Sequence, residues 1–319
     1  MTTEIYIVSG FLGAGKTTLI QKLIKESFQK DKIALIENDF GEISVDAALL
    51  KSGGVEVKEI NSGCICCSLS GDFVKAVKEL LDRFHPDKII IEPSGVGKLS
   101  DIVKACSDQR IQKLVKVKSK ITVVDVKRCK MYLDNFGEFF EDQIQNADVV
   151  LLNRTEKFPD KINDANKLIK SLNSNSAIIS KPWDQISPEE ILYPEYKHHT
   201  HGHHCSCGHN HHDKNHVHDG HCGCEHNHAA EDIFDTVTIR TKKIFSTDDL
   251  EARILYMERN AKGTILRAKG ILHSTKGYVN VQYLPGDIRI TNCTTSGDML
   301  SIIGRNLNQQ ELCSLFNGE

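Results

Sequence analysis

The stretch Gly10-Phe11-Leu12-Gly13-Ala14-Gly15-Lys16-Thr17-Thr18 is a complete phosphate-binding P-loop, and it decides the fold of this chain. Its glycines let the backbone curl so that several N–H groups point into one concavity. Lys16 can reach the β- and γ-phosphates of a nucleotide, and the Thr17 hydroxyl can hold Mg²⁺. An apolar run at 5–8 precedes the motif and a helical pattern follows it, so the helix dipole also favours an anion here.

Short β-branched runs alternate with amphipathic stretches on both sides of this motif. We expect strands at 5–8, 33–36, 55–60, 89–91, 121–124, 149–152 and 177–179, and helices at 17–30, 73–84 and 162–172. The strands lack polar alternation. They therefore predict an α/β fold, a P-loop NTPase whose mostly parallel sheet is covered by helices. Ligands of such sheets bind at the carboxyl ends of the strands.

The segment 198–228 has a different composition. It holds thirteen of the fifteen histidines, and the run His204-Cys205-Ser206-Cys207 recurs as His221-Cys222-Gly223-Cys224. Because Val217 is its one apolar residue, it cannot pack a core, and we expect it to be disordered without metal. Histidine and Cys-x-Cys ligands indicate binding of Zn²⁺, Ni²⁺ or Co²⁺, and a solubilising spacer is the alternative.

Structure is expected to resume near residue 231. Val237 and Ile239 alternate with polar residues, and Ser246 with Asp249 predicts the start of a helix that runs to about Glu258. Further strands are expected at 264–266, 278–283 and 288–290. This order predicts a small α+β domain with an antiparallel sheet.

Composition narrows the class of protein. The chain has 319 residues and a net charge of −3, which gives no reason to expect a nucleic acid or an anionic membrane as partner. No apolar run reaches membrane-spanning length, and the first residues do not form a signal peptide, so we expect a cytoplasmic protein. Eleven cysteines are many for that compartment, and their clustering argues for metal binding rather than disulfides.

Two further motifs suit a nucleotide site. Glu92 and Gly95 end an apolar strand, where an acidic residue assists Mg²⁺ and a glycine N–H senses the γ-phosphate. The run Asn153-Arg154-Thr155-Glu156 stands where guanine-binding proteins carry Asn-Lys-x-Asp. Glu156 keeps the carboxylate that accepts from guanine, and Arg154 can stack on the base. The longer Glu156 side chain leaves the choice between GTP and ATP open.

Three thiols stand within four residues at Cys64, Cys66 and Cys67. Thiolates suit Zn²⁺, Cu(I) and, less selectively, Co²⁺ or Ni²⁺. A buried or redox-active cysteine patch is the alternative. Adjacent cysteines are poor disulfide partners, so the pattern favours a metal site.

These motifs together resemble the CobW family of GTPases, which are related to the UreG and HypB metallochaperones. The resemblance rests on the P-loop, on Glu37-Asn38-Asp39-Phe40-Gly41-Glu42, on the three thiols, on Glu92–Gly95 and on Asn153–Glu156. It extends to the His-rich segment and to Leu266-Arg267-Ala268-Lys269-Gly270. It implies a GTPase domain at 1–190, a metal-binding linker at 191–230 and a CobW-like domain at 231–319.

The resemblance implies a GTP-hydrolysing metallochaperone. Cys66 and Cys67 would hold the metal, with Cys64 or Glu37 completing the site, and residues 37–42 would act as a nucleotide-dependent switch. Asp39 or Glu42 would orient the hydrolytic water. Zinc is the first choice of cargo and cobalt the second. The partner would be a client metalloprotein or a corrinoid-pathway protein, and a metal- or nucleotide-dependent dimer is compatible with this mechanism. A metal store or sensor, a cobalt-insertion accessory protein and a P-loop small-molecule kinase are the alternatives.

Overall fold

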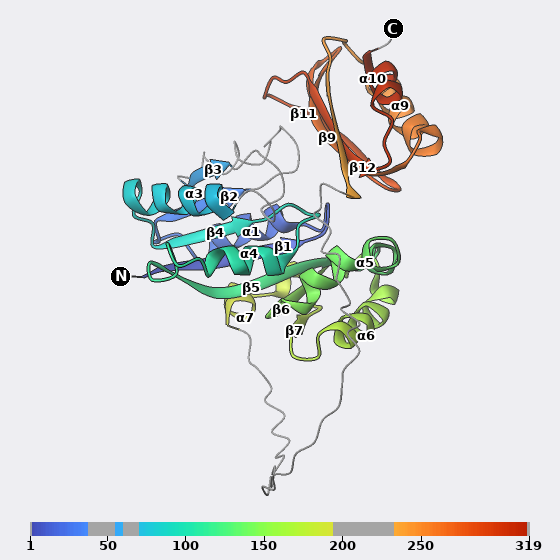
Figure 1. The fold of residues 1–319 in the computed structure, drawn as a ribbon. Coiled ribbons are helices and arrows are strands. Elements are labelled where there is room, and N and C mark those ends of the chain that lie inside the picture. Colours follow the sequence, from blue (N-terminus) through green and yellow to red (C-terminus); the bar gives the residue numbers. More distant parts are fainter. Residues whose placement is uncertain (1, 38–54, 60–69, 194–232, 318–319) are drawn as a thin grey trace, which may run out of the picture.

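The computed structural model describes residues 2–37, 55–59, 70–193 and 233–317. In these residues the chain forms a seven-stranded parallel sheet and a five-stranded antiparallel sheet, each with its own helices (Figure 1). In the described part of the chain, no helix is both long and apolar enough to cross a membrane.

The first sheet has the strand order β3-β2-β4-β1-β5-β6-β7, with the P-loop strand in its centre. Its strands are β1 Thr3–Gly10, β2 Ile33–Glu37, β3 Glu56–Glu59, β4 Lys88–Glu92, β5 Val115–Asp125, β6 Val149–Asn153 and β7 Ala177–Ile179. Its helices are α1 Lys16–Glu26, α3 Ser70–Arg83, α4 Leu99–Cys106, α5 Cys129–Gln145, α6 Ile162–Leu172 and α7 Pro188–Leu192. The predicted α/β fold is confirmed.

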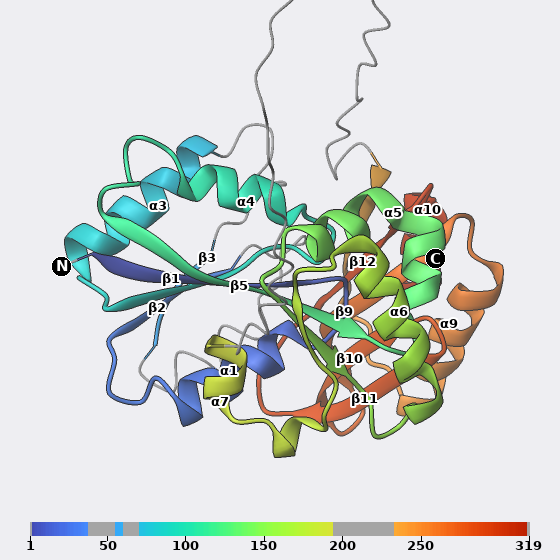
Figure 2. The same cartoon turned by 90° about the horizontal axis from the view of Figure 1, so that it is seen from below.

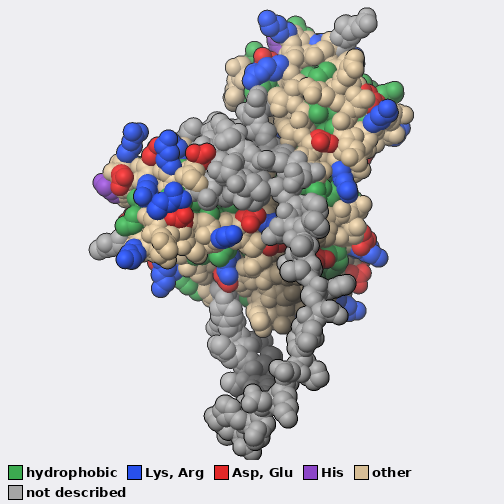
Figure 3. Space-filling model, viewed as in Figure 1, with side chains coloured by type: hydrophobic (Ala, Val, Ile, Leu, Met, Phe, Trp, Pro, Cys, Tyr) green, Lys and Arg blue, Asp and Glu red, His purple; other side chains and the backbone are tan. Residues whose placement is uncertain are grey.

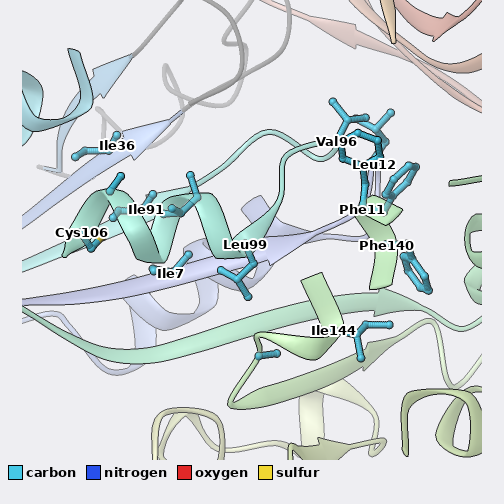
Figure 4. Packing of buried hydrophobic residues seen from close by; sticks show 14 of the residues in the cluster. Ile7, Phe11, Leu12, Ile36, Ile91, Val96, Leu99, Cys106, Phe140 and Ile144 are labelled. Carbon is cyan, nitrogen blue, oxygen red and sulfur yellow. The ribbon is translucent and has the colours of Figure 1, made fainter. Parts of the chain in front are cut away.

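Helices cover both faces of this sheet. Helices α3, α4, α5 and α6 lie on one face and α1 and α7 on the other (Figure 2). Successive residues of a strand point to opposite faces, so Ile5 and Ile7 enter the first core while Tyr6 and Val8 enter the second. Figure 4 shows the first core, where Ile7 packs with Leu99 of α4 and Phe11 with Phe140 of α5.

Three helices of this domain, α4, α5 and the five-residue α7, were not predicted from the sequence. Helix α4 has only eight residues. In α5 the backbone of Phe136 is non-helical, with φ of −138°, so the apolar period breaks in the middle of the helix. Helix α1 ends at Glu26 rather than near residue 30, because the N–H groups of Ser27 and Phe28 both close on the Leu23 carbonyl.

The second sheet has the order β11-β10-β9-β12-β8. Its strands are β8 Asp235–Arg240, β9 Thr264–Ser274, β10 Gly277–Leu284, β11 Asp287–Cys293 and β12 Met299–Arg305, and its helices are α9 Thr247–Asn260 and α10 Gln309–Asn317. The predicted cap is confirmed, since the Ser246 hydroxyl accepts from the Asp249 N–H at 3.0 Å. Strand β12 and helix α10 were not predicted.

One face of this second sheet packs on α9 and α10, which bury Leu250, Ile254 and Phe316 against it. The two helices lie on the side of the sheet away from the first domain (Figures 1 and 2). The opposite sheet face therefore turns toward the P-loop. At the contact between the domains, Phe234, Leu266 and Ile303 join the core that contains Phe11.

The four cysteines in the described residues differ in burial. Cys106 and Cys129 are buried, and burial raises the pKa of each thiol to about 12, so both stay protonated at neutral pH. Cys293 and Cys313 are partly exposed. The surface view shows basic and acidic side chains intermixed over the first domain rather than gathered by sign (Figure 3).

Candidate nucleotide site

The P-loop joins β1 to α1 with a backbone that only glycine adopts easily. Gly10, Gly13 and Gly15 have φ values of 141°, 66° and 112°. A Cβ on Gly10 would lie 2.4 Å from the Val123 carbonyl oxygen, and one on Gly15 would lie 2.4 Å from Asn153 Nδ2. Helix α1 begins at Lys16, so its free N–H groups and its dipole face the loop.

A cavity of about 460 Å³ opens directly over this loop. One side is the P-loop wall, which we define as the lining residues from the first domain: Gly13, Gly15, Lys16, Thr17, Thr18, Gln21, Glu92, Asn153, Arg154, Glu156 and Lys157. The other side is the C-terminal wall: Arg267, Gln282, Tyr283, Leu284, Asp287 and Arg289. The volume is within the usual range for a small-molecule site.

Thr17 and Glu92 form an oxygen-rich pair in the P-loop wall. The Thr17 hydroxyl lies 3.1 Å from both carboxylate oxygens of Glu92, which ends β4. A hydroxyl and a carboxylate are the hard oxygen donors that Mg²⁺ prefers. The donor set therefore fits Mg²⁺.

Glu37 ends β2 beside Glu92, with which it is paired in the register of the parallel strands. Leu35 and Ile90 both pack on the α1 side of the sheet. Glu37 and Glu92 each stand two residues further along their strands, so both carboxylates turn to that same side. Glu37 is only 6% exposed. A candidate ligand for a transition metal thus lies next to the candidate Mg²⁺ carboxylate.

Asn153 and Arg154 connect the base-binding motif to the P-loop. The Asn153 amide donates to the Ala14 carbonyl at 2.6 Å, and its side-chain oxygen accepts from the Arg154 N–H at 2.7 Å. Arg154 has a left-handed backbone, with φ of 64°. Glu156 is exposed in the cavity wall, where a carboxylate is open to a ligand.

Three of the predicted site residues lie behind the cavity surface. Gly10 is backed by β5, the Ala14 carbonyl accepts from Asn153, and Gly95 lies against Leu12, where a Cβ would be 2.8 Å from the Leu12 N. The Gly95 carbonyl also accepts from Gln143 at 3.2 Å.

The remaining predicted residues fall outside the described part of the chain. They are Asp39, Glu42, Cys64, Cys66, Cys67, His204, Cys205, Cys207, His221, Cys222 and Cys224. The described residues alone contain no group of three or more His, Cys, Asp or Glu side chains that could hold a metal ion.

A buried carboxylate that we did not predict links the two walls. Asp125, at the carboxyl end of β5, lies 2.7 Å from Arg128 Nη1 and 2.9 Å from Arg154 Nη1. Arg128 donates to the Pro285 carbonyl at 3.0 Å, and Arg154 lies 3.7 Å from Asp287. One aspartate thus holds two guanidinium groups that both reach the β10–β11 turn.

The sequence marks only some of the residues that we did not predict for this site. Asp125 directly follows an expected strand, so the strand-end rule that identified Glu92 also applies to it. Arg267 belongs to a run quoted for the family resemblance, but no motif marks it as a nucleotide-site residue. Gln282, Leu284 and Asp287 reach the cavity only through the pairing of β9, β10 and β11.

Comparison with known proteins agrees with this geometry. The family model described as CobW/HypB/UreG, nucleotide-binding domain, matches residues 4–180, and the cobalamin synthesis protein cobW C-terminal domain matches residues 234–318. A Sinorhizobium protein named zinc chaperone CobW is 36% identical over 178 residues, and the match covers 47% of this chain and 50% of that protein.

Two Escherichia coli matches concern the protein named YjiA. The curated protein, named zinc chaperone YjiA, is 33% identical over 158 residues, and the match covers 48% of this chain and 49% of that one. The crystal structure of Zn(II)-bound YjiA GTPase has 18% identity and a TM-score of 0.45, covering 99% of this chain and 98% of that one. The chain spans about half the length of the curated relatives it matches. The chain belongs to the CobW/HypB/UreG family of nucleotide-binding domains and also carries the CobW C-terminal domain.

Proposed function

We propose that this protein is a GTP-hydrolysing metallochaperone that binds a transition metal and releases it to a client metalloprotein under nucleotide control. Zinc is the first choice of cargo, because several curated relatives are named zinc chaperones. Cobalt is the second. The observation that carries the proposal is the pairing of Glu37 with Glu92 at the edge of one sheet, which joins a candidate metal ligand to the nucleotide site.

The P-loop wall supplies the nucleotide chemistry. Lys16 and the N-terminus of α1 would hold the phosphates, and Thr17 with Glu92 would hold Mg²⁺, which offsets negative charge on the phosphate oxygens. Gly95 lies behind the cavity surface, so it would sense the γ-phosphate through Leu12 of the P-loop, on which it packs. Asp39 or Glu42 would orient the attacking water. Catalysis in this class depends mostly on positioning and charge stabilisation rather than on a covalent intermediate.

Base selection would depend on Glu156, whose carboxylate is open in the cavity wall. It would accept from two guanine N–H groups, which adenine lacks. We expect Glu156→Gln to lower affinity for a GTP analogue by at least about tenfold, since a charge-assisted hydrogen bond is lost. Equal affinity for GTP and ATP analogues in the unaltered protein would contradict guanine selection.

The cargo site would use Cys66 and Cys67, completed by Cys64 or by the buried Glu37. The Cys residues follow β3, which lies beside β2 in the sheet. A γ-phosphate that repositions the segment after Glu37 would assemble the ligands, and hydrolysis would release them. The segment 198–228 would collect metal at several sites in a way that does not depend on nucleotide.

Linkage provides the test of this coupling. If a GTP analogue strengthens metal binding, then zinc must strengthen binding of that analogue by the same factor. We expect zinc to raise the affinity for a fluorescent GTP analogue at least about tenfold, a coupling typical of allosteric sites. Glu37→Gln should abolish most of this gain while leaving affinity for GDP unchanged.

Glu190→Gln is the matched control, because Glu190 lies in α7, pairs with Lys181 on the surface and does not line the cavity. It should keep the full gain. A protein whose GTP-analogue affinity is indifferent to zinc, yet binds several zinc ions per chain, would be a metal store and not a nucleotide-gated chaperone.

A further inference from the structure

The C-terminal wall presents the sheet face that α9 and α10 leave uncovered. Val281 and Tyr283 of β10 pack in the core with those helices, so Gln282 and Leu284 point the other way. Gln282 is paired with Lys269 of β9 and with Arg289 of β11. Continuing these registers by two residues places Leu284 between Arg267 on one side and Asp287 on the other.

This register orders the C-terminal wall along the nucleotide cavity. Asp287 stands at the base end, 3.7 Å from Arg154 of the base-binding motif. Leu284 stands over the P-loop, where its side chain packs directly on Gly13. Because Arg267 lies on the far side of Leu284 from Asp287, it stands beyond Gly13, at the end of the cavity that would hold the terminal phosphate.

A second observation supports this position of Arg267. The Tyr132 hydroxyl donates to the Leu12 carbonyl, just before Gly13 in the P-loop. Burial raises the pKa of Tyr132, and the positive charges of Arg128, Arg154 and Arg267 oppose that rise. The guanidinium of Arg267 is thus close enough to the start of the P-loop for its field to act there.

Arg267 also differs from the other arginines of the cavity in its partners. Arg154 pairs with Asp125 at 2.9 Å, and Arg289 lies 3.5 Å from Asp287. Across the described ranges, no hydrogen bond or ion pair engages Arg267, although it lines the cavity and is half-buried. A half-buried guanidinium with five donors and no carboxylate partner among the described residues is suited to an anion.

We propose that Arg267 of the C-terminal domain contacts the terminal phosphate of the bound nucleotide and stabilises the transition state of hydrolysis from within the same chain. This inference rests on the proposed GTP hydrolysis and assigns the C-terminal domain a part in it. The water oxygen bonds to the γ-phosphorus while the bond to the β–γ bridging oxygen breaks. The electron pair leaves with GDP, and the water's protons are shared between phosphate and solvent. Arg267 stabilises the negative charge that moves onto the bridging and γ-oxygens.

Three variants of the full chain test this inference. Arg267→Ala removes the guanidinium, Arg267→Lys keeps the charge without the planar fork, and Arg259→Ala removes an exposed arginine of α9 as the control. Three quantities are measured for each variant. They are the affinity for Mg·GDP, the capture of GDP with aluminium fluoride, which imitates the transferring phosphoryl group, and the rate of single-turnover GTP hydrolysis.

We expect Mg·GDP affinity to change by less than about threefold in all three variants, because Arg267 acts beyond the β-phosphate. Arg267→Ala should lose aluminium fluoride capture and at least about 10²-fold in hydrolysis rate, as arginines with this role do. Arg267→Lys should keep GDP binding, which shows that it folds and docks, and recover only part of the rate. Arg259→Ala should match the unaltered protein.

Two results would overturn the inference in distinguishable ways. If Arg267→Ala captures GDP·aluminium fluoride and hydrolyses GTP like the unaltered protein, then Arg267 has no such role, while the proposed GTPase function stands. If the unaltered protein neither binds nor hydrolyses GTP, both the proposed function and the role of Arg267 are wrong.

Discussion

The two walls of the nucleotide cavity are built in different ways. The P-loop wall comes from strand ends and one helix start, and much of its ligand chemistry is backbone N–H groups held by left-handed glycines. The C-terminal wall is a sheet face to which three neighbouring strands, β9, β10 and β11, each contribute residues. A contiguous motif specifies the first wall, whereas distant strand pairing specifies the second. In the proposed mechanism, the first wall binds the nucleotide and the second wall adjusts its hydrolysis.

The largest effect should come from the P-loop wall itself. Lys16→Ala removes the ammonium group that lies at the start of α1 in the cavity. We expect a loss of at least about 10²-fold in affinity for a GTP analogue, because charge-assisted hydrogen bonds to phosphate are lost. Titration with a fluorescent analogue measures it. Lys22→Ala, on the same helix but paired with Glu26, should bind normally. Near-normal binding by Lys16→Ala would mean that the cavity is not the nucleotide site.

The second effect should appear at the join between the walls. Asp125→Asn removes the buried charge that holds Arg128 and Arg154. Breaking a buried pair from one side costs about 3 kcal/mol or more, because the two guanidinium groups lose the buried carboxylate that compensates their charge. Denaturant unfolding measures the loss. Asp108→Asn, which breaks a surface pair with Arg110, is the control and should leave the midpoint almost unchanged. An equally small effect of Asp125→Asn would show that the Asp125 ion pairs contribute little to the stability of the fold.

A third, intermediate effect tests whether the walls touch. Gly13→Ala would place a Cβ 2.3 Å from Leu284 Cδ1 and would strain a backbone with φ of 66°. Leu284→Ala removes the side chain that this Cβ would meet. We therefore expect the double variant to be more stable than the sum of the single changes predicts, by about 1 kcal/mol, as contacting residues show.

The unfolding free energies of the four proteins in this cycle give the coupling directly. The backbone strain at residue 13 is present in Gly13→Ala and in the double variant, so it cancels in the cycle. Strict additivity would mean that Leu284 and Gly13 are not in contact and that the C-terminal wall lies further from the P-loop.

The smallest effect should come from outside both walls. Burial and the nearby Asp142 raise the pKa of Asp101 in the first turn of α4. The folded protein therefore holds this proton more tightly than the unfolded chain does, and the charged form lowers stability at neutral pH. Asp101→Asn should be slightly stabilising at pH 7, and the gain should vanish as the pH falls below about 4.

Asp164 provides the matched control for that change, since it takes the same third position in α6 but is exposed. Asp164→Asn should give no gain at any pH. A gain at Asp101 that persists at low pH would show that its cause is not the ionised carboxylate.

These contrasts also explain which features sequence reasoning could predict. Gly10–Thr17 lies in one stretch whose glycines are needed locally, so the P-loop could be predicted from it. The parallel sheet could be predicted because its apolar strands alternate with amphipathic helices along the chain. Helix α5 was not predicted, because the helical backbone is interrupted at Phe136. The C-terminal wall was not predicted, because Arg267, Leu284 and Asp287 become neighbours only through the register of β9, β10 and β11. Composition and residue spacing do not determine that register. The domain limits and the roles of the thiols stay predictions.

The central claim is that the nucleotide state controls metal affinity, and zinc binding in two nucleotide states tests it most directly. Competition with a chelator would give the zinc affinity of the full chain with a Mg·GTP analogue and with Mg·GDP, for the unaltered protein and for Cys66→Ala. Sites in segment 198–228 should contribute equally in both states. We predict one site whose affinity rises at least about tenfold with the GTP analogue, and the loss of that site in Cys66→Ala. Equal zinc affinity in the two nucleotide states would contradict nucleotide control of the metal site.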